Sequence, residues 1–180
     1  MEKKIKVVAI IQARMGSSRF PGKVLKELAG TTILDLIIER ISLTKGLNDI
    51  VLSTSLSKRD DILESWAKDR ELNFYRGSEH DVLDRYYQTA KLFQADIIIR
   101  ITADDPLKDH EILEKALRFF QNNECLDYCS NTINPTYPEG LDVEVFSFSV
   151  LESISSQSFC ILSHSPFKSL SKTILPKTKG

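Results

Sequence analysis

Short apolar segments alternate with longer amphipathic segments along most of this chain, and this alternation restricts the fold more than any other feature. The apolar segments are typical of strands, and the first and last are continuous Val/Ile runs of the kind found in strands covered on both faces. The predicted strands are residues 6–11, 49–54, 72–75 and 96–101. Apolar residues at helical spacing predict helices over residues 33–43, 60–72, 79–93 and 109–120. Strands that alternate with helices predict an α/β fold: a wound, mostly parallel sheet with helices on both faces.

Polar residues mark the expected starts of three of these helices. Thr32 is the expected N-cap of the first helix, with Asp35 three residues later. Ser78 is the expected cap of the third helix, and Asp81 occupies the capping-box position. Asp109 is the expected cap of the fourth helix.

The pattern changes in the last third of the chain. Residues 141–146 alternate as a strand, with Asp142 and Glu144 on one face. Beyond residue 153 the composition shifts to many Ser, scattered Lys and no acidic residue, so we expect no packed core there. A chain of 180 residues has the size of one domain. We therefore expect a domain over residues 1–153 and an atypical Ser/Lys-rich tail over residues 154–180.

A loop rich in small and basic residues follows the first predicted strand directly. Its glycines let backbone N–H groups approach a polyanion closely, and its Arg and Lys side chains neutralise charge. The alternative, a solvated basic turn, is disfavoured because three cations converge on one strand end. We therefore predict a phosphate-binding loop, whose candidate residues are Gln12, Ala13, Arg14, Gly16, Ser17, Ser18, Arg19 and Lys23.

Two common phosphate loops do not match this segment. The run from Gly16 to Lys23 is superficially similar to a Walker A motif, but five residues rather than four separate Gly16 from Gly22. Val24 stands where that motif requires a Mg²⁺-binding Ser or Thr. The three-glycine dinucleotide fingerprint is also missing, which disfavours a nicotinamide-dependent dehydrogenase.

A pair of acids follows the strand predicted over residues 96–101. Open α/β sheets bind ligands at the carboxyl ends of their strands, where Asp104 and Asp105 stand. Adjacent carboxylates suit Mg²⁺, which takes one or two of them and completes its shell with water and substrate phosphate. We predict Asp104 as the Mg²⁺ ligand, and the alternative is that it caps the following helix.

Polar residues also precede the third predicted helix. Arg76, Gly77 and Ser78 lie where a strand meets that helix, and Arg85 lies one turn inside it. Amides at a helix start can contact a base or a phosphate. An ordinary capped, salt-bridged helix start is an equally good interpretation.

A Pro- and Gly-containing turn leads into the strand predicted over residues 141–146. That strand can present Asp142 or Glu144 to a metal ion or a substrate hydroxyl. A solvated strand face explains the same acids equally well.

Charge and the N-terminal segment limit the classes of partner. Lys plus Arg number 24 against 25 for Asp plus Glu, so the net charge of -1 provides no general attraction to nucleic acid or to an anionic membrane. The apolar run over residues 5–11 is too short for a membrane span or a signal peptide. We expect a cytoplasmic protein with no nucleic-acid or membrane partner.

Four segments, residues 11–25, 76–83, 100–107 and 137–146, together resemble a known family. They are similar to the cytidylyltransferases that activate 3-deoxy-manno-octulosonate and acylneuraminate, and most of all to the branch named for spore-coat polysaccharide biosynthesis protein F. The resemblance covers residues 5–153 in order, and the first segment is highly specific.

The resemblance implies a nucleotide-diphospho-sugar transferase type of fold. It also implies a reaction in which the hydroxyl of a sugar or sugar acid attacks the α-phosphate of CTP and pyrophosphate leaves, for surface polysaccharide synthesis. In its relatives the residues that match Arg14, Ser18 and Lys23 hold the triphosphate, and the residue that matches Asp104 binds Mg²⁺. The reaction mostly requires positioning and neutralisation of charge, which agrees with the residue types in the loop.

The expected site follows from these matches. Arg14, Lys23 and Asp104 are the expected catalytic residues. The other expected roles are nucleotide binding by Arg76, Gly77 and Ser78, substrate binding by Arg100, Asp142 and Glu144, and metal binding by Asp142 beside Asp104.

The chain departs from the family after residue 152. Family members continue with a helical segment that carries a Glu-His-Val-Thr-like signature and helps build the sugar pocket and the dimer, and residues 154–180 show none of it. We therefore expect a truncated C-terminus, retained nucleotide binding, reduced turnover and a weakened homodimer. Two other hypotheses are a glycosyltransferase that consumes a nucleotide-sugar and a nucleotide-binding partner subunit without activity.

Overall fold

The computed structural model describes residues 4–16, 20–133 and 137–157, and its main sheet has six strands in the order β5-β4-β1-β6-β8-β7. The strands are β1 (Val7–Gln12), β4 (Asp49–Ser55), β5 (Asn73–Gly77), β6 (Ile97–Thr102), β7 (Tyr128–Ser130) and β8 (Glu144–Ser147). Strands β1, β4, β5 and β6 are parallel, whereas β8 runs antiparallel to both β6 and β7. The mostly parallel α/β sheet that the sequence predicts is confirmed.

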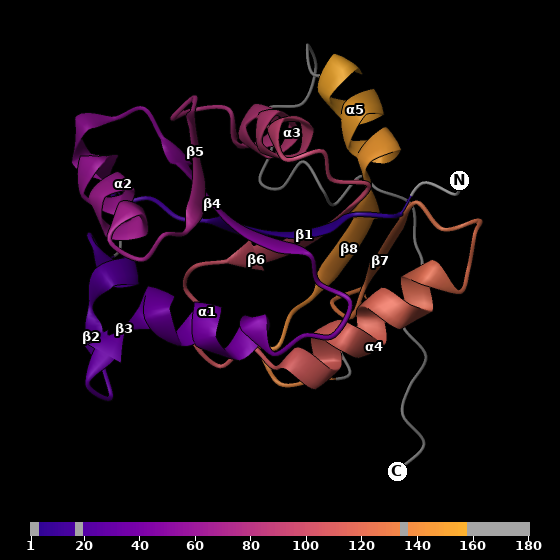
Figure 1. Ribbon diagram of the computed structural model, residues 1–180, viewed down its shortest axis with the longest axis horizontal. Helices are drawn as coiled ribbons and strands as arrows, with labels where there is room; N and C mark the ends of the chain where they lie inside the picture. The colour runs from indigo at the N-terminus through magenta and orange to yellow at the C-terminus, as the bar shows by residue number, and fades with distance from the viewer. Residues whose placement is uncertain (1–3, 17–19, 134–136, 158–180) are drawn as a thin grey trace.

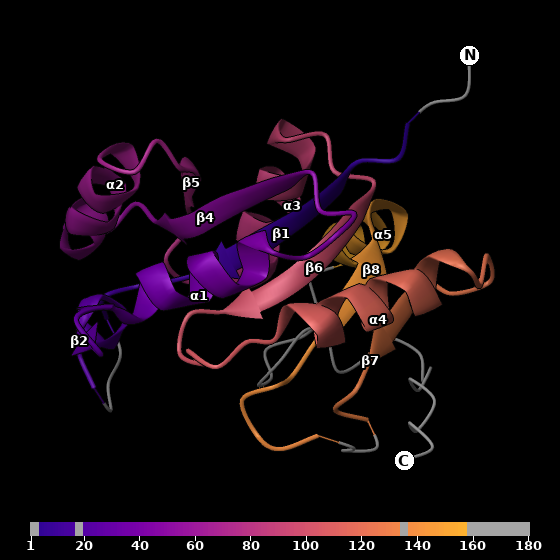
Figure 2. The same cartoon turned by 60° about the horizontal axis from the view of Figure 1, so that its bottom comes forward.

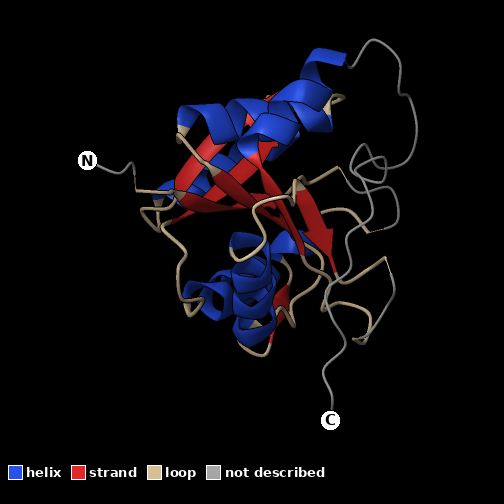
Figure 3. Cartoon of the chain, turned by 90° about the vertical axis from the view of Figure 1, so that its right-hand side faces the viewer, coloured by secondary structure: helices blue, strands red, loops and turns tan. Residues whose placement is uncertain are grey.

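Helices cover both faces of this sheet (Figure 1). They are α1 (Ile33–Ser42), α2 (Asp61–Lys68), α3 (Val82–Leu92), α4 (His110–Gln121) and α5 (Phe148–Gln157). Buried residues of α1, α2 and α4 belong to a first hydrophobic cluster, and those of α3 and α5 belong to a second. Figure 2 shows α1 and α4 over one face of the sheet, and Figure 3 shows the strands between the two layers of helices.

Alternation along each strand divides its side chains between these two clusters. In β1, Val7 and Ile11 lie in the first cluster, while Val8 and Ile10 lie in the second. All four are at most 1% exposed. Each fully buried Val or Ile side chain contributes roughly 1.5–3 kcal/mol of transfer free energy. A strand covered on both faces therefore explains the continuous Val/Ile run in the sequence.

The caps of the helices follow the sequence prediction in two of three cases. The Thr32 side chain accepts a hydrogen bond from the Asp35 N–H, and the Asp109 side chain accepts from the first turn of α4. The predicted cap at Ser78 is wrong. Asp81 is the N-cap of α3, because its carboxylate accepts from the Asp84 N–H at 2.8 Å, so the helix begins three residues later than predicted.

Helix α2 ends at Lys68, four residues before its predicted end. Glu71 has a φ of 54°, in the left-handed region, so the chain leaves the helical conformation there. The Leu72 N–H then donates to the Ala67 carbonyl at 2.9 Å, which closes the helix end. Leu72 thus leads directly into β5.

Several elements have no counterpart in the sequence prediction. They are the hairpin of β2 (Glu27–Leu28) and β3 (Thr31–Thr32), the short strand β7, the helix α5, and the 3-10 helices η1 (Lys23–Leu25) and η2 (Lys58–Asp60). Helix α5 continues across the expected boundary at residue 153, and Ile154 packs against the second cluster. The rest of the expected tail, residues 158–180, lies outside the described residues.

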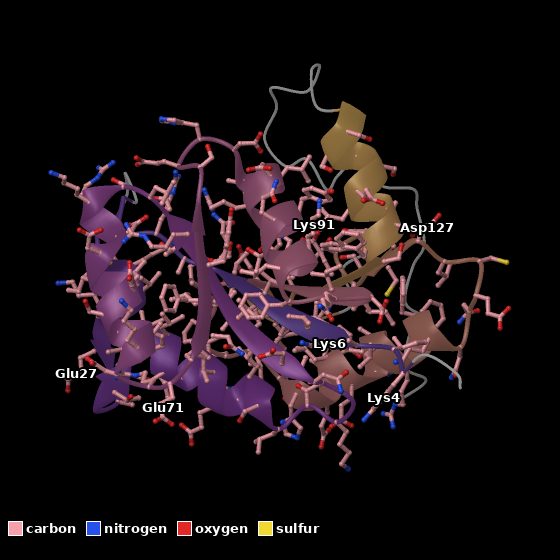
Figure 4. All side chains as sticks on the ribbon, turned by 45° about the horizontal axis from the view of Figure 1, so that its top comes forward. Lys4, Lys6, Glu27, Glu71, Lys91 and Asp127 are labelled. Carbon is pink, nitrogen blue, oxygen red and sulfur yellow. The ribbon has the colours of Figure 1, made fainter. Side chains whose placement is uncertain are left out.

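The course of β1 orients the molecule. Figure 4 labels Glu27 of β2 at the far left, Lys6, just before β1, nearer the middle, and Asp127, just before β7, at the right. Strand β1 therefore runs toward the β2–β3 hairpin, and the carboxyl ends of the parallel strands lie on that side. Within the described part of the chain, no helix is long and apolar enough to cross a membrane.

Candidate functional site

The carboxyl ends of β1 and β6 lie side by side at a point where the chain connections diverge. From β1 the chain passes to β4 on one side, and from β6 it passes toward β8 and β7 on the other. In open α/β sheets, ligands bind at such switch points, outside the carboxyl ends of the strands. The two loops that the sequence singles out both begin here.

The loop after β1 is closed at its base by backbone hydrogen bonds. The Ala13 N–H donates to the Ser53 carbonyl at 3.1 Å, and the Gly22 N–H donates to the Met15 carbonyl at 3.0 Å. Gly22 has a φ of 70°, and a Cβ there would lie 3.2 Å from the Met15 Cε. Both observations require glycine at this position, because an L side chain would be strained and crowded. The loop therefore returns on itself and places Lys23 beside the strand from which it started.

Asp60 anchors this loop, and the sequence analysis missed it. Its Oδ1 accepts from the Met15 N–H at 2.7 Å, and its Oδ2 accepts from the N–H and the hydroxyl of Ser55 at the end of β4. The residue is only 2% exposed. An acid five residues after the carboxyl end of a parallel strand is the signal that could have identified it.

Lys23 and Asp104 meet between the loops that follow β1 and β6. The Lys23 Nζ lies 2.7 Å from the Asp104 Oδ2, and the two side chains are 28% and 45% exposed. Burial opposes ionisation of Asp104, but hydrogen bonds from Lys23 and Thr102 and the charge of Lys23 outweigh it, so the pKa of Asp104 is lowered. An ammonium and an ionised carboxylate thus stand together at the strand ends.

The residues near Asp104 fit a divalent cation only in part. Among the residues that the structure describes, no group of three or more His, Cys, Asp or Glu side chains is placed to hold a metal ion. Mg²⁺ needs only one or two protein carboxylates when substrate phosphates and water complete its shell. The donor set around Asp104 therefore suits a metal that arrives with a phosphate ligand.

The neighbouring Asp105 has a different role. Its Oδ2 accepts from the Thr102 hydroxyl at 2.8 Å and from the Lys108 Nζ at 3.0 Å. Lys108 is 1% exposed, and its Nζ also donates to the Asp142 carbonyl at 2.9 Å. Asp105 and Lys108 therefore fasten the loop after β6 to the segment that precedes β8. The Asp142 side chain is exposed.

Arg100 and Glu144, both predicted to bind substrate, form an ion pair across β6 and β8. The Tyr128 hydroxyl donates to the Glu144 Oε2 at 3.1 Å. Tyr86 of α3 lies close to the pair, and burial raises the pKa of Tyr86 to about 12 despite the charge of Arg100. The Glu144 side chain is 14% exposed, which excludes the solvated strand face as its environment.

The structure places Arg76 away from these groups. Phe74 of β5 packs on the first cluster, and Arg76, two residues later, points to the same face. Its guanidinium donates to Glu64 and Asp61 of the α2 helix at 2.6 and 2.7 Å, and to the carbonyls of Ser55 and Ser57. These contacts give Arg76 a structural role between β4 and α2.

Gly77 and Ser78 lie beside α3. A Cβ on Gly77 would stand 2.8 Å from the Tyr75 ring and 2.9 Å from the Arg85 Cγ, so close packing excludes any side chain there. The Ser78 hydroxyl accepts from the N–H groups of His80 and Asp81, at 3.3 and 3.1 Å. Ser78 thus shapes the turn before α3.

The remaining predicted residues of the first loop differ in placement. Gln12 ends β1 on the face of α3, since Val8 and Ile10 of the same strand pack there. Ala13 is 2% exposed in the first cluster, and Arg14 is exposed. A Cβ on Gly16 would lie 3.4 Å from the Arg59 guanidinium. The other predicted loop residues, Ser17, Ser18 and Arg19, lie outside the described residues.

Comparisons with known proteins agree with this geometry. The family model described as cytidylyltransferase matches residues 8–158. The chain is 40% identical over 148 residues to an uncharacterized protein of Methanocaldococcus jannaschii, covering 82% of this chain and 59% of that protein. It is 35% identical over 154 residues to the spore coat polysaccharide biosynthesis protein SpsF of Bacillus subtilis, covering 83% and 62%. The chain thus spans about three fifths of the length of these relatives.

A solved structure supports the same assignment. A cytidylyltransferase from Leptospira borgpetersenii superposes with a TM-score of 0.81 at 36% identity, covering 92% of this chain and 68% of that one. The predicted family resemblance is confirmed by the family match, by these relatives and by this structure. This chain belongs to the cytidylyltransferase family.

Proposed function

We propose that this chain binds CTP with Mg²⁺ at the ends of β1 and β6 and transfers CMP to a sugar or sugar acid used for surface polysaccharide synthesis. In this reaction a substrate hydroxyl oxygen forms a bond to the α-phosphorus. The bond from that phosphorus to the bridging oxygen breaks, pyrophosphate leaves with the electron pair, and the hydroxyl proton is released. Family membership and the name of the Bacillus subtilis relative support this class of reaction.

The observation that carries the proposal is the Lys23–Asp104 pair at the switch point. The ammonium and the carboxylate lie 2.7 Å apart, next to a loop closed by the Gly22–Met15 hydrogen bond. A triphosphate with its metal ion satisfies both groups at once, because Lys23 binds phosphate oxygens and Asp104 binds the cation. When nucleotide binds, the Lys23–Asp104 ion pair therefore breaks: Lys23 moves to the phosphate oxygens and Asp104 to the cation.

The side chains around the pair need only position reactants and balance charge. Lys23 and Arg14 place positive charge beside the phosphates, which stabilises the additional negative charge of the transition state. When Mg²⁺ is bound by Asp104, it neutralises phosphate oxygens and supports the departure of pyrophosphate. No nucleophilic side chain is required.

The Arg100–Glu144 pair supports a substrate position next to the nucleotide. Strand β6 joins Arg100 to the loop that carries Asp104, and the pair faces α3, the same side of the sheet as Gln12. A guanidinium held by a carboxylate keeps a fixed orientation, which suits recognition of a hydroxyl or a carboxylate on the second substrate.

A nucleotide panel tests the proposal. Thermal unfolding of the 180-residue chain is followed with CTP, UTP, ATP and GTP, each with and without Mg²⁺, because a ligand that binds only the native state raises the unfolding temperature. We expect the largest shift with CTP plus Mg²⁺. A pyrophosphate-release assay with a set of sugars and sugar acids then identifies the second substrate. Equal shifts with all four nucleotides, or none with CTP, would contradict the proposal.

A further inference from the structure

Arg85 is a buried arginine whose hydrogen bonds are incomplete. It lies in the first turn of α3 and is 0% exposed. Its Nη1 donates to the backbone carbonyls of Ser78 and Glu79. Its Nε and Nη2 have no hydrogen-bond partner within the residues that the structure describes. Buried polar groups are nearly always paired, so two unpaired donors on one guanidinium point to a missing acceptor.

The two unpaired nitrogens lie on one edge of the guanidinium. The Nε–H and one N–H of Nη2 point in the same direction and match two oxygens of a single phosphate or carboxylate group. The opposite side of the group, Nη1, is already bound to backbone. Arg85 is therefore oriented by the protein, and its bidentate edge makes no hydrogen bond to the residues that the structure describes.

The charges around Arg85 leave its guanidinium without a hydrogen-bonded carboxylate. Burial lowers the pKa of Arg85 and the charge of Arg14 adds to this, while Tyr86, Asp60 and Asp81 act in the opposite direction, and arginine stays ionised at neutral pH. The two carboxylates are engaged elsewhere: Asp60 accepts from Met15 and Ser55, and Asp81 accepts from Asp84. The positive charge of Arg14 thus acts on Arg85, and neither carboxylate makes a hydrogen bond to it.

The position of Arg85 connects it to the nucleotide loop. Its side chain packs against Gly77 at the carboxyl end of β5, and Arg14 follows the carboxyl end of β1. Both ends belong to the same edge of the parallel sheet, and Asp60 joins the β1 loop to the end of β4, which lies between them. An anion between Arg85 and Arg14 would therefore extend the site that contains Lys23 and Asp104.

We propose that Arg85 binds a phosphate group of the nucleotide through its Nε and Nη2 edge, together with Arg14. This inference rests on the proposed nucleotide function and adds a phosphate ligand from α3 to the groups at the ends of β1 and β6. Both nitrogens are enclosed in the ligand-free arrangement, so binding requires a local rearrangement. The phosphate then supplies the two acceptors that the buried guanidinium lacks.

Titration calorimetry of the 180-residue chain with CTP, CMP and cytidine at constant Mg²⁺ tests the proposal. Arg85→Met keeps the length of the side chain and removes the charge, and Arg85→Lys keeps the charge and removes the bidentate edge. We expect Arg85→Met to weaken CTP binding by about 10- to 100-fold and Arg85→Lys to weaken it by a smaller factor. Binding of cytidine, which has no phosphate, should not change.

Arg70→Met is the matched control, because Arg70 pairs with Asp35 and stacks on Trp66, among the helices of the other face. It should leave CTP binding unchanged. Arg85→Met should unfold without ligand at a temperature equal to or above that of the wild type, because it removes an incompletely paired buried charge. If Arg85→Met does not fold, Arg85→Lys alone decides the question.

Three results would overturn the phosphate contact: wild-type CTP affinity in the folded Arg85 variants, an equal loss for CTP and cytidine, or a loss confined to the sugar-acid substrate. The outcome for the proposed function is separate. If the wild type binds four nucleoside triphosphates alike, CTP specificity fails, while an Arg85-dependent loss for all of them still supports the phosphate contact.

Discussion

Arg76 and Arg85 lie nine residues apart, one at the end of β5 and one at the start of α3, yet they serve opposite faces of the sheet. Arg76 faces α2, where Glu64, Asp61 and two backbone carbonyls accept from all three of its nitrogens. Arg85 faces the interior under α3, where, among the described residues, only one of its nitrogens has partners.

This difference separates an arginine that holds the fold together from one that is prepared for a ligand. Both residues occur in a motif that looks uniformly functional in the sequence, and residue type alone does not distinguish them. The number of hydrogen bonds does: Arg76 donates four within the protein, from all three of its nitrogens, whereas both hydrogen bonds of Arg85 within the described part of the chain come from Nη1.

The neighbouring acids Asp104 and Asp105 differ in a similar way. Asp105 accepts from Thr102 and from the buried Lys108, so it serves the fold. Asp104 is 45% exposed beside Lys23, so it is accessible to a ligand.

The largest effect is expected on the ligand side, for Lys23→Ala. Loss of one charge-assisted contact to phosphate should weaken CTP binding by about 30- to 100-fold, measured by calorimetry. The unfolding temperature without ligand should change little, because the Lys23–Asp104 pair is partly exposed. Lys26→Ala, an exposed lysine three residues later, is the control and should bind CTP as the wild type does. Equal losses in the two variants would remove Lys23 from the site.

The next effect is expected on the structural side, for Arg76→Met. Removing this partly buried guanidinium leaves the Ser55 and Ser57 carbonyls without this donor, while Glu64 keeps Lys68, which should cost about 2 kcal/mol of unfolding free energy in urea denaturation. CTP affinity should stay at the wild-type value. Arg59→Met, which breaks the exposed pair with Glu79, should cost less than about 1 kcal/mol. Weaker CTP binding by Arg76→Met at unchanged stability would show that Arg76 binds the nucleotide and does not stabilise the fold.

A smaller effect is expected for Asp60→Asn. The Asp60 side chain links the loop after β1 to the end of β4. The amide keeps one acceptor oxygen but cannot accept at both positions, so a hydrogen bond to Met15 or Ser55 is lost, at about 1 kcal/mol. We expect a modest fall in the urea midpoint and a severalfold loss of CTP affinity, because the β1 loop loses its anchor. A variant with normal affinity would show that the loop does not depend on this anchor.

The smallest effect is the pH dependence of the Lys23–Asp104 pair. The pKa of Asp104 is lowered from its ordinary value of 3.8, so the unfolded chain binds its proton more readily than the folded chain. The pair therefore stabilises the fold fully above the unfolded value and stops doing so as the pH falls through the lower folded value. Since Asp104 is 45% exposed, we expect less than about 0.5 kcal/mol. The free energy of unfolding is measured by urea titration at pH 6 and at pH 3. Asp104→Asn should reduce the fall in this free energy between the two pH values by the contribution of the pair. An unchanged fall would assign the pH dependence to other carboxylates.

Much of the sheet could be predicted because its strands are buried on both faces. The continuous Val/Ile runs of β1 and β6 leave no other interpretation, and both strands are found within one residue of their predicted bounds. Strand β7 was missed, because its three residues, Tyr128–Ser130, are a strand only through pairing with β8. Helix α5 was missed because serines dilute its apolar face, and packing of Leu151 and Ile154 against the second cluster compensates for this.

For the candidate site, the sequence could predict the loops that form it, but not the contacts of each side chain. Lys23 and Asp104 were each predicted on a loop at the carboxyl end of a buried strand, and the structure brings their side chains to 2.7 Å. The direction of each side chain was not predictable. Arg76 and Gly77 are adjacent in the sequence, but alternation along β5 sends one to α2 and the other to α3. The loop anchor Asp60 lies 45 residues from Met15, and only the fold brings them together.

The most direct test of the account is a crystal structure of this chain with CTP and Mg²⁺. We predict the triphosphate on the α3 side of the carboxyl ends of β1 and β6, with Lys23 on phosphate oxygens, the metal at Asp104, and a phosphate at the Nε and Nη2 edge of Arg85. A triphosphate bound instead at Arg76 on the α2 side, or one with Arg85 still enclosed and Lys23 still paired with Asp104, would contradict it.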